Sequence, residues 1–196
     1  MMNLLRKSLA IEIDGFVNFI HGQCRSTKTF TQSAFVQARK KIKPAVFKKL
    51  SQTIINEFYT DNGTSIKLWN GFRLLAVDGS RITLPITDEL EAIYGQTKNQ
   101  TETSIVQARC SVLYDVENNY VIDGVLAPLA KGERALALPH LEYCQLDDLL
   151  IYDRGYPSYE FIYEHVSQGL DYLMRIKATF SQSVIDFEAS KKSRKS

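Results

Sequence analysis

The sequence predicts an α/β fold in which a small helical amino-terminal domain precedes a mixed β-sheet. Apolar residues recur at a helical period of about 3.6 before the turn cluster Asp61–Ser65, and at a period of 2 after it. Two short apolar runs, Phe72–Val77 and Leu149–Tyr152, each lead directly into an aspartate. Such runs are typical of strands that are buried on both faces. We therefore expect a helical domain over residues 1–62 and a sheet-based domain over residues 68–196.

Composition and cysteine usage narrow the class of protein. A chain of 196 residues with 44% hydrophobic and 23% charged residues has the composition of an ordinary globular protein. No apolar run approaches the roughly 20 residues that a membrane helix needs, and acidic residues interrupt the apolar amino terminus, which disfavours a signal peptide. Three widely spaced cysteines and three scattered histidines favour free thiols over a disulfide framework or a zinc site. We therefore expect a cytoplasmic protein.

The amino-terminal residues are expected to form three helices that carry much of the positive charge. Residues 1–22 and 45–59 place apolar side chains near the helical period, and Ser33 is expected to cap a helix between them. Residues 1–60 contain ten lysine and arginine residues against three acidic ones, whereas the whole chain has a net charge of only +2. A basic module of this kind is typical of nucleic-acid binding, with a solvated helix face as the alternative. The candidate DNA-binding residues of the second helix are Arg39, Lys40 and Lys41.

Three strands are expected to follow the domain boundary. Residues 72–84 form the first, residues 86–103 are expected to be an irregular excursion, and residues 104–116 alternate as the second strand. Residues 120–129 return as the third strand of a hairpin. In the second strand the residues expected on one side are Val106, Ala108, Cys110, Val112 and Tyr114.

Helices and strands then alternate along the chain. Residues 132–144 are expected to form a helix, followed by the strand that leads into Asp153, a helix from residue 159, and a fifth strand over residues 170–176. The resulting order β-β-β-α-β-α-β is that of a ribonuclease H-like fold, in which the first and fourth strands are neighbours. Asp78 and Asp153 should therefore lie at the carboxyl ends of adjacent strands, where open α/β sheets collect their ligands.

Two aspartates at the ends of adjacent strands suggest a metal site. Hard cations such as Mg²⁺ take carboxylate oxygens as ligands, and two such ions stabilise both the attacking and the leaving oxygen in phosphodiester cleavage. Structural alternatives exist for each residue. Asp78 precedes Gly79 and is a common turn residue, and Asp153 has Arg154 as a neighbour or could cap the helix that follows.

Several motifs together resemble a known family, the DDE transposases of bacterial insertion sequences, in the branch whose catalytic domain carries a β-rich insertion. The motifs are LLAVDGSRITLP (74–85), ARCSVLYDV (108–116), GER (132–134), LLIYDRGYPSYEFI (149–162), YLMRIK (172–177) and the leader SAFVQARKKIKPAVF (33–47). The resemblance implies metal-dependent DNA cleavage and strand transfer, with two Mg²⁺ or Mn²⁺ ions bound by Asp78 and Asp153. It implies a bacterial, nucleoid-associated protein. Its partners would be the terminal inverted repeats and target DNA, with a homodimer in a synaptic complex as one possible assembly and no membrane.

Further residues of these motifs are candidates for contacts to DNA phosphate or bases. They are Arg154, Tyr156, Arg175 and Lys177, with Arg109 and Arg134 as secondary candidates. For Tyr156 the alternative is a role in packing.

The resemblance also requires a third carboxylate, a glutamate within a Tyr…Arg…Glu…Lys motif, and this sequence lacks that motif. We favour a truncated or frameshifted copy, although a second reading frame could supply the missing part. Glu188 could also stand in, but residues 180–187 have the pattern of a strand rather than a helix. A non-catalytic DNA-binding or inhibitory fragment is therefore the competing function, and a ribonuclease H-like nuclease on another substrate is the third.

Overall fold

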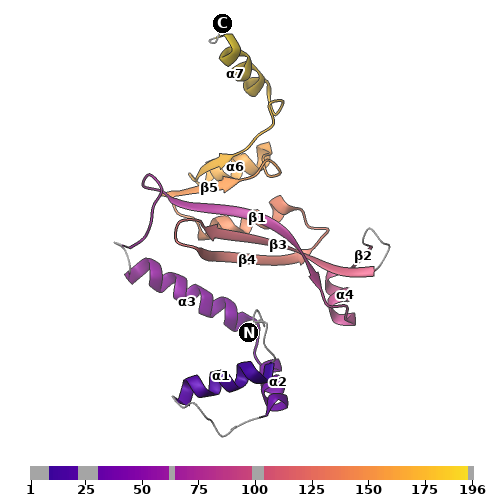
Figure 1. Ribbon diagram of the computed structural model, residues 1–196. Helices are drawn as coiled ribbons and strands as arrows, with labels where there is room; N and C mark the ends of the chain where they lie inside the picture. Colours follow the sequence, from indigo (N-terminus) through magenta and orange to yellow (C-terminus); the bar gives the residue numbers. More distant parts are fainter. Residues whose placement is uncertain (1–8, 22–30, 62–64, 99–103, 194–196) are drawn as a thin grey trace. The chain divides into compact units, whose positions relative to one another are not determined.

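The computed structural model describes residues 9–21, 31–61, 65–98 and 104–193 (Figure 1). The chain divides into two compact units, residues 1–54 and 55–196, and the division falls within helix α3. The functional domains expected over residues 1–62 and 68–196 remain a prediction. None of the helices in the described residues combines the length and the apolar character that a bilayer crossing requires.

Three helices precede the sheet. They are α1 (Leu9–His21), α2 (Gln32–Lys40) and α3 (Ala45–Asp61). The cap of α2 is Thr31 rather than the predicted Ser33, because Thr31 has an extended backbone and its side-chain oxygen accepts the N–H of Ala34 at 3.1 Å. Residues 1–8, part of the predicted first helix, lie outside the described residues.

The second unit contains a mixed sheet, and its strand order confirms the predicted ribonuclease H-like fold (Figure 1). Strand β3 pairs antiparallel with both β1 and β4, and β5 pairs parallel with both β1 and β6. Strand β2 pairs with the first residues of β3. The strands in the described residues are β1 (Arg73–Leu84), β2 (Gln96–Lys98), β3 (Ser104–Asp115), β4 (Tyr120–Pro128), β5 (Asp148–Tyr152) and β6 (Asp171–Met174).

The helices of the second unit differ in places from the expected ones. Those described are α4 (Asp88–Tyr94), α5 (Glu133–Ala137), the 3₁₀ helix η1 (Leu138–Tyr143), α6 (Tyr159–Ser167) and α7 (Gln182–Ser193). The helix expected over residues 132–144 changes to 3₁₀ geometry at Leu138, because Pro139 has no N–H to continue the α-helical ladder. The stretch expected to be irregular contains α4, which Thr87 caps, and β2, while residues 99–103 lie outside the described part of the chain.

The strand predicted over residues 180–187 is wrong, since most of this segment belongs to α7. The apolar residues Phe180, Val184 and Phe187 are four and three positions apart, which is helical spacing. Ser181 also accepts the N–H of Val184 at 3.3 Å, as a helix-capping side chain does. Glu188 therefore lies on a helix, where it is exposed.

The buried side of β3 changes along the strand, which corrects the expected single apolar face. Val106 and Ala108 are fully buried, but the next buried residues are Ser111, Leu113 and Asp115, on the opposite side of the strand. Leu113 belongs to the main core, whereas Val106 and Ala108 do not, and β3 contacts α4 as well as that core. Different elements therefore cover β3 at different points.

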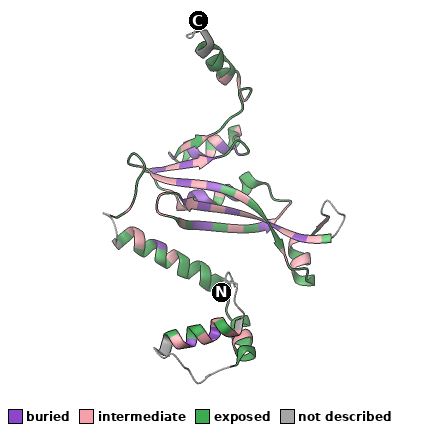
Figure 2. Ribbon diagram, viewed as in Figure 1, coloured by how far each residue is buried: buried purple, intermediate pink, exposed green. Residues whose placement is uncertain are grey.

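The main core lies on the side of the sheet where η1 and α6 pack, and Figure 2 shows buried residues following the central strands. Leu75, Leu113 and Leu150 from three neighbouring strands have no exposed surface. They pack with Leu141 of η1 and Phe161 of α6, among other apolar side chains. Burying large aliphatic and aromatic side chains of this kind is worth about 1.5–3 kcal/mol each.

An ion pair fixes the alignment of β1 and β5. Arg73 donates to Asp148 through Nε at 2.7 Å and Nη2 at 2.6 Å, and Asp148 is only 1% exposed. Tyr59, on the part of α3 that belongs to this unit, lies under the Arg73 guanidinium and donates to the buried carboxylate of Asp115. The bidentate contact between Arg73 and Asp148 sets the register of β1 and β5. It lies five positions before Asp78 on β1 and five positions before Asp153 after β5.

Candidate metal-binding site

The two predicted aspartates lie at the same level on neighbouring strands. Strands β1 and β5 pair in parallel from Arg73 opposite Asp148 to Ala76 opposite Ile151. Continuing this register by two residues places Asp78 opposite Asp153, and neighbouring strands are about 4.8 Å apart. Both aspartates are exposed. The topology therefore brings together two carboxylates that are 75 positions apart in the sequence.

Only Asp153 ends its strand, so the prediction that Asp78 also does so is wrong. Strand β1 continues to Leu84, because after leaving β5 it keeps β3 as an antiparallel partner, with Asp78 opposite Val112. Asp78 is therefore in the middle of β1, at the point where β5 stops beside it.

A glycine N–H orients each of these carboxylates. Gly79 donates to Oδ1 of Asp78 at 2.8 Å, and Gly155 donates to Oδ1 of Asp153 at 2.7 Å. A Cβ on Gly155 would lie 3.0 Å from that same Asp153 oxygen, closer than nine in ten real Cβ contacts. The glycine of the DRG sequence therefore gives the Asp153 carboxylate room to fold back onto the turn.

The GER motif at the start of α5 lies beside both glycines. A Cβ on Gly79 would lie 3.1 Å from Cγ of Glu133, and a Cβ on Gly155 would lie 3.9 Å from Oε2 of Glu133. Arg134 donates to the carbonyl oxygen of Gly155 through Nε at 3.3 Å and Nη2 at 3.1 Å. Arg134 thus ties the start of α5 to the turn that carries Asp153. Arg109 of β3 forms an ion pair with Glu133.

Sequence reasoning did not include Glu133 among the site residues. The available signal was its place in the GER motif, directly after Gly132 and before Arg134. Its proximity to Gly79 and Gly155 depends on how α5 docks against β1 and the turn after β5, which no local pattern of residues reveals.

Tyr156 places a buried hydroxyl next to these carboxylates. Its side chain is 1% exposed and packs against the rings of Tyr152 and Phe161. Its hydroxyl lies 3.5 Å from the point that a Cβ on Gly79 would occupy, and it has no hydrogen-bond partner within the described residues. Burial raises the pKa of this hydroxyl, and so do the negative charges of Glu133, Asp78 and Asp153. This burial agrees with the packing alternative for Tyr156, and its predicted contact to DNA remains untested.

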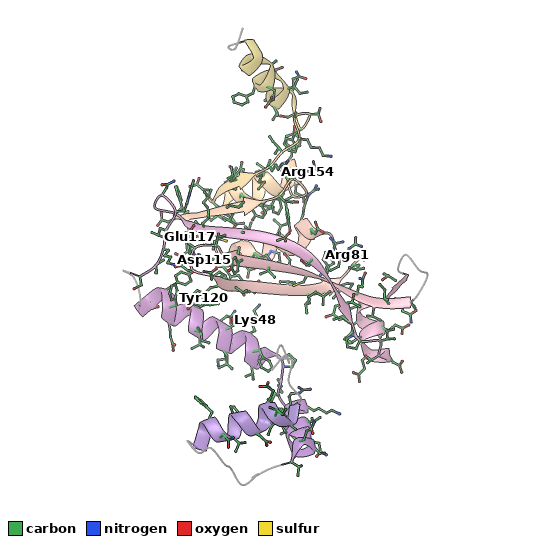
Figure 3. The ribbon with its side chains drawn as sticks, in the orientation of Figure 1. Lys48, Arg81, Asp115, Glu117, Tyr120 and Arg154 are labelled. Carbon is green, nitrogen blue, oxygen red and sulfur yellow. The ribbon has the colours of Figure 1, made fainter. Side chains whose placement is uncertain are left out.

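A cleft of about 580 Å³ lies beside the site and is lined by three arginines. Arg81 and Arg109 are cross-strand partners on β1 and β3, and Arg134 comes from α5. Glu133 and Gly155 also line the cleft, which makes it continuous with the carboxylate region. Figure 3 shows Arg81 on the distal part of β1 and Arg154 in the turn after β5.

The other candidate DNA contacts are exposed. Arg154, Arg175 and Lys177 belong to the second unit and follow the carboxyl ends of β5 and β6. Arg39, Lys40 and Lys41 lie at the end of α2, in the first unit. Their DNA-binding roles stay predictions.

A divalent cation such as Mg²⁺ needs several oxygen ligands around it. Among the described residues, no three Asp, Glu, His or Cys side chains converge closely enough to hold a metal ion. The chemistry of the donors nevertheless fits, since Asp78 and Asp153 offer carboxylate oxygens on adjacent strands. Beside them, the buried Tyr156 hydroxyl has no partner in the described part of the chain. Cys110 and Cys144 are free thiols, as predicted, and Cys24 lies outside the described residues.

Comparison with known proteins identifies the family. Residues 69–195, more than half of the chain, match the family described as Transposase DDE domain. No curated protein matches the sequence significantly.

Two solved structures show a distant likeness. One is the Mos1 transposase paired-end complex with the left transposon end, at 10% identity and a TM-score of 0.32, covering 81% of this chain and 48% of that chain. The other is the Mos1 mariner paired-end complex with Mn, at 12% identity and a TM-score of 0.32, covering 81% of this chain and 49% of that chain. This chain thus spans about half the length of those chains. The family assignment depends on the sequence match alone, and by that match the chain belongs to the transposase DDE domain family.

Proposed function

We propose that this chain carries the catalytic region of a transposase that cuts DNA at the ends of an insertion sequence and joins the freed end to target DNA. The observation that supports this proposal is the matched level of Asp78 and Asp153 on adjacent strands, in a chain of the DDE family. The proposed partners are the terminal inverted repeats and target DNA, with a homodimer as the synaptic assembly. The proposed location is the bacterial cytoplasm, at the nucleoid.

Asp78 and Asp153 are the residues that would hold the divalent ions, Mg²⁺ or Mn²⁺. Two bound ions would neutralise charge on the attacking and leaving oxygens of the phosphodiester. The protein's own contribution is to keep the two carboxylates in place, through the N–H groups of Gly79 and Gly155 and through the contact of Arg134 with the turn. Water is the first nucleophile in this scheme and the freed 3′ hydroxyl is the second, so no side chain needs to form a covalent bond to DNA.

We propose that the DNA backbone binds in the arginine-lined cleft. Arg81, Arg109 and Arg134 present guanidinium groups, whose planar geometry suits phosphate oxygens. Because the cleft shares Glu133 and Gly155 with the carboxylate region, a backbone lying in it would pass next to Asp153.

A second function, DNA binding without catalysis, is favoured by a specific observation. The described residues contain no cluster of three metal-binding side chains, and two carboxylates alone hold a cation weakly. Such a chain would occupy element ends through its basic residues and compete with complete transposases.

A cleavage and strand-transfer assay with labelled end DNA and Mn²⁺ separates these functions. We expect Asp78→Asn and Asp153→Asn each to lower cleavage by about 1000-fold or more, since charge stabilisation is the main catalytic term in this chemistry. Asp147→Asn is the matched control, because Asp147 is an exposed aspartate just before the opposite end of β5. End binding that survives in all variants without any cleavage would support the non-catalytic function. Equal cleavage of unrelated DNA or RNA would instead support a general nuclease.

A further inference from the structure

We propose that Glu133 blocks Arg109 of the arginine-lined cleft in the free chain, and that a DNA phosphate displaces its carboxylate, which then moves to the Tyr156 hydroxyl. The inference rests on the proposed function, because it concerns the cleft in which the DNA backbone is proposed to bind. It describes an autoinhibitory contact, since the cleft contains a carboxylate that competes with phosphate for an arginine.

The Glu133 carboxylate occupies a position that suits a phosphate. Glu133 and Arg109 both line the cleft, and Nη1 of Arg109 donates to Oε1 of Glu133. A carboxylate and a phosphodiester each present two oxygens that match the guanidinium group, so they compete for the same donors. The Arg109 side chain is 15% exposed and the Glu133 side chain is 45% exposed. The arginine is therefore held by its surroundings, whereas the glutamate is free to rotate away.

The contact with Glu133 leaves the positive charge of the cleft incompletely satisfied. Nε of Arg109 is buried and has no hydrogen-bond partner among the described residues, although buried donors normally have one. Arg81 lies directly opposite Arg109 on the neighbouring strand, and like charges in such positions repel each other. A phosphate that contacts both arginines, or two donors of one, is therefore bound more tightly than the carboxylate that it replaces.

The buried Tyr156 hydroxyl provides a second position for the carboxylate. Its oxygen and Cδ of Glu133 each lie 3.5 Å from the point that a Cβ on Gly79 would occupy, so the two groups border the same small space. The hydroxyl has no hydrogen-bond partner within the described residues. Burial raises the pKa of Tyr156, and the charge of Glu133 is the next cause. The protonated hydroxyl is thus a donor that a rotation of the Glu133 side chain can satisfy.

Gly79 keeps the space between the two positions open. A Cβ at this residue would lie 3.1 Å from Cγ of Glu133, tighter than nine in ten real Cβ contacts. The released carboxylate would also lie near Asp78 and Asp153, whose negative charges act on the same tyrosine. A carboxylate in such surroundings needs a hydrogen-bond donor, and this requirement gives the Tyr156 hydroxyl its role.

Binding of labelled end DNA to the full chain, measured by fluorescence anisotropy in EDTA, tests the autoinhibitory contact without requiring activity. We expect Glu133→Ala to lower the Kd about fivefold, the upper end of what a partly exposed ion pair is worth. Glu160→Ala is the matched control, because Glu160 lines the same cleft and is exposed. It measures the general effect of removing one negative charge, which should be at most about twofold at physiological salt.

A double-mutant cycle tests the role of the tyrosine. Tyr156→Phe keeps the buried ring and should raise the Kd about threefold in the unchanged chain, because the displaced carboxylate loses its donor. The same substitution should have no effect when Glu133→Ala is already present. An equal loss of affinity in both backgrounds would show that the hydroxyl contacts DNA itself and would overturn the movement of Glu133. Equal melting temperatures would show that the variants are folded, since the hydroxyl has no partner to lose among the described residues.

Two arginine variants separate this inference from the proposed function. Arg81→Gln and Arg109→Gln should each weaken DNA binding and reduce the slope of log K against log salt by about 0.9, the value for one phosphate contact. If both leave binding unchanged, or if the unchanged chain binds no end DNA, the proposed function fails and the inference fails with it. If both weaken binding but Glu133→Ala tightens it no more than Glu160→Ala does, the inference alone is overturned.

Discussion

The segment Gly132–Tyr143 contributes to two polar clusters that have opposite characters. At its start, Glu133 joins Asp78 and Asp153 in an acidic cluster whose three residues are exposed. Near its end, His140 joins Ser111 of β3 and Asp123 of β4 in a buried triad, with Nε2 at 3.0 Å from the serine hydroxyl and Nδ1 at 2.9 Å from the carboxylate.

The buried triad has the residue types of a hydrolase active site, but it is not accessible to a substrate. Ser111 and His140 have no exposed surface and Asp123 is 5% exposed. The carboxylate accepts from Nδ1, which leaves Nε2 to the serine, so the histidine uses both of its nitrogens. A substrate could not reach the serine hydroxyl without unfolding this part of the sheet. The triad therefore joins β3, β4 and η1 as a structural element.

The acidic cluster shows the reverse arrangement. Its carboxylates are anchored by single contacts to glycine N–H groups and to Arg109, and the nearby Tyr156 hydroxyl is left without a partner among the described residues. The difference teaches that the types of residue do not identify a functional site. What distinguishes the acidic cluster is its exposure together with its unused hydrogen-bonding capacity.

The largest expected effect on stability comes from removing the histidine of the buried triad. His140→Ala should lower the free energy of unfolding by about 3–5 kcal/mol, because it removes the imidazole from a buried carboxylate and a buried hydroxyl. Asp153→Asn, at the exposed cluster, should change it by less than about 0.5 kcal/mol. Urea unfolding of the full chain measures both. Similar losses of unfolding free energy in the two variants would show that the acidic cluster stabilises the fold as much as the buried triad does.

A smaller effect is expected from crowding the acidic cluster while leaving its charges intact. In Gly155→Ala the added Cβ would meet Oδ1 of Asp153 at 3.0 Å and should displace that carboxylate. We expect a Kd for Mn²⁺ about tenfold higher, the lower end of what disturbing the surroundings of a metal ligand costs. Gly124→Ala on β4 is the control, because nothing lies within 4 Å of its Cβ position. Equal Mn²⁺ affinities in the two variants would contradict the geometry at Gly155.

The order of the strands could be predicted from the sequence because it depends on local patterns. The apolar runs before Asp78 and Asp153, with glycine and proline after them, mark the two central strands independently of any distant contact. The order of elements then made those strands neighbours, as the pairing of Arg73 with Asp148 confirms.

What could not be predicted depends on contacts between distant residues. Glu133 approaches Gly79 across 54 positions and Gly155 across 22, so no short motif links them. The burial of Tyr156 and of the Ser111, Asp123 and His140 side chains follows from packing in the same way. The error at α7 had another cause: the spacing of Phe180, Val184 and Phe187 was helical but was interpreted as alternation.

The smallest expected effect is a change in the pH dependence of stability, and it concerns a second buried histidine, His165. Unlike His140, His165 has two uncharged partners: Nδ1 donates to the carbonyl oxygen of Phe161 at 2.8 Å, and Nε2 accepts from the Tyr152 hydroxyl at 2.8 Å. The ring of Tyr172 packs against it, and the charged group acting on it is Glu164. Burial lowers the pKa of His165 below its ordinary value of 6.5, although the Phe161 carbonyl and Glu164 act in the opposite direction.

The sign of the resulting pH dependence follows from the neutral state of His165 in the folded chain. The unfolded chain takes up a proton on this residue as the pH falls below 6.5, whereas the folded chain does so only at lower pH. The contribution of His165 to stability is therefore complete above pH 6.5 and is lost as the pH falls toward the folded pKa, with a slope of at most about 1.4 kcal/mol per pH unit. His165→Gln should flatten the decline in urea midpoint between pH 6.5 and 5 without changing the trend above pH 7. An unchanged slope in this variant would show that His165 takes up its proton at the same pH in the folded and unfolded chains, and would contradict the lowered pKa.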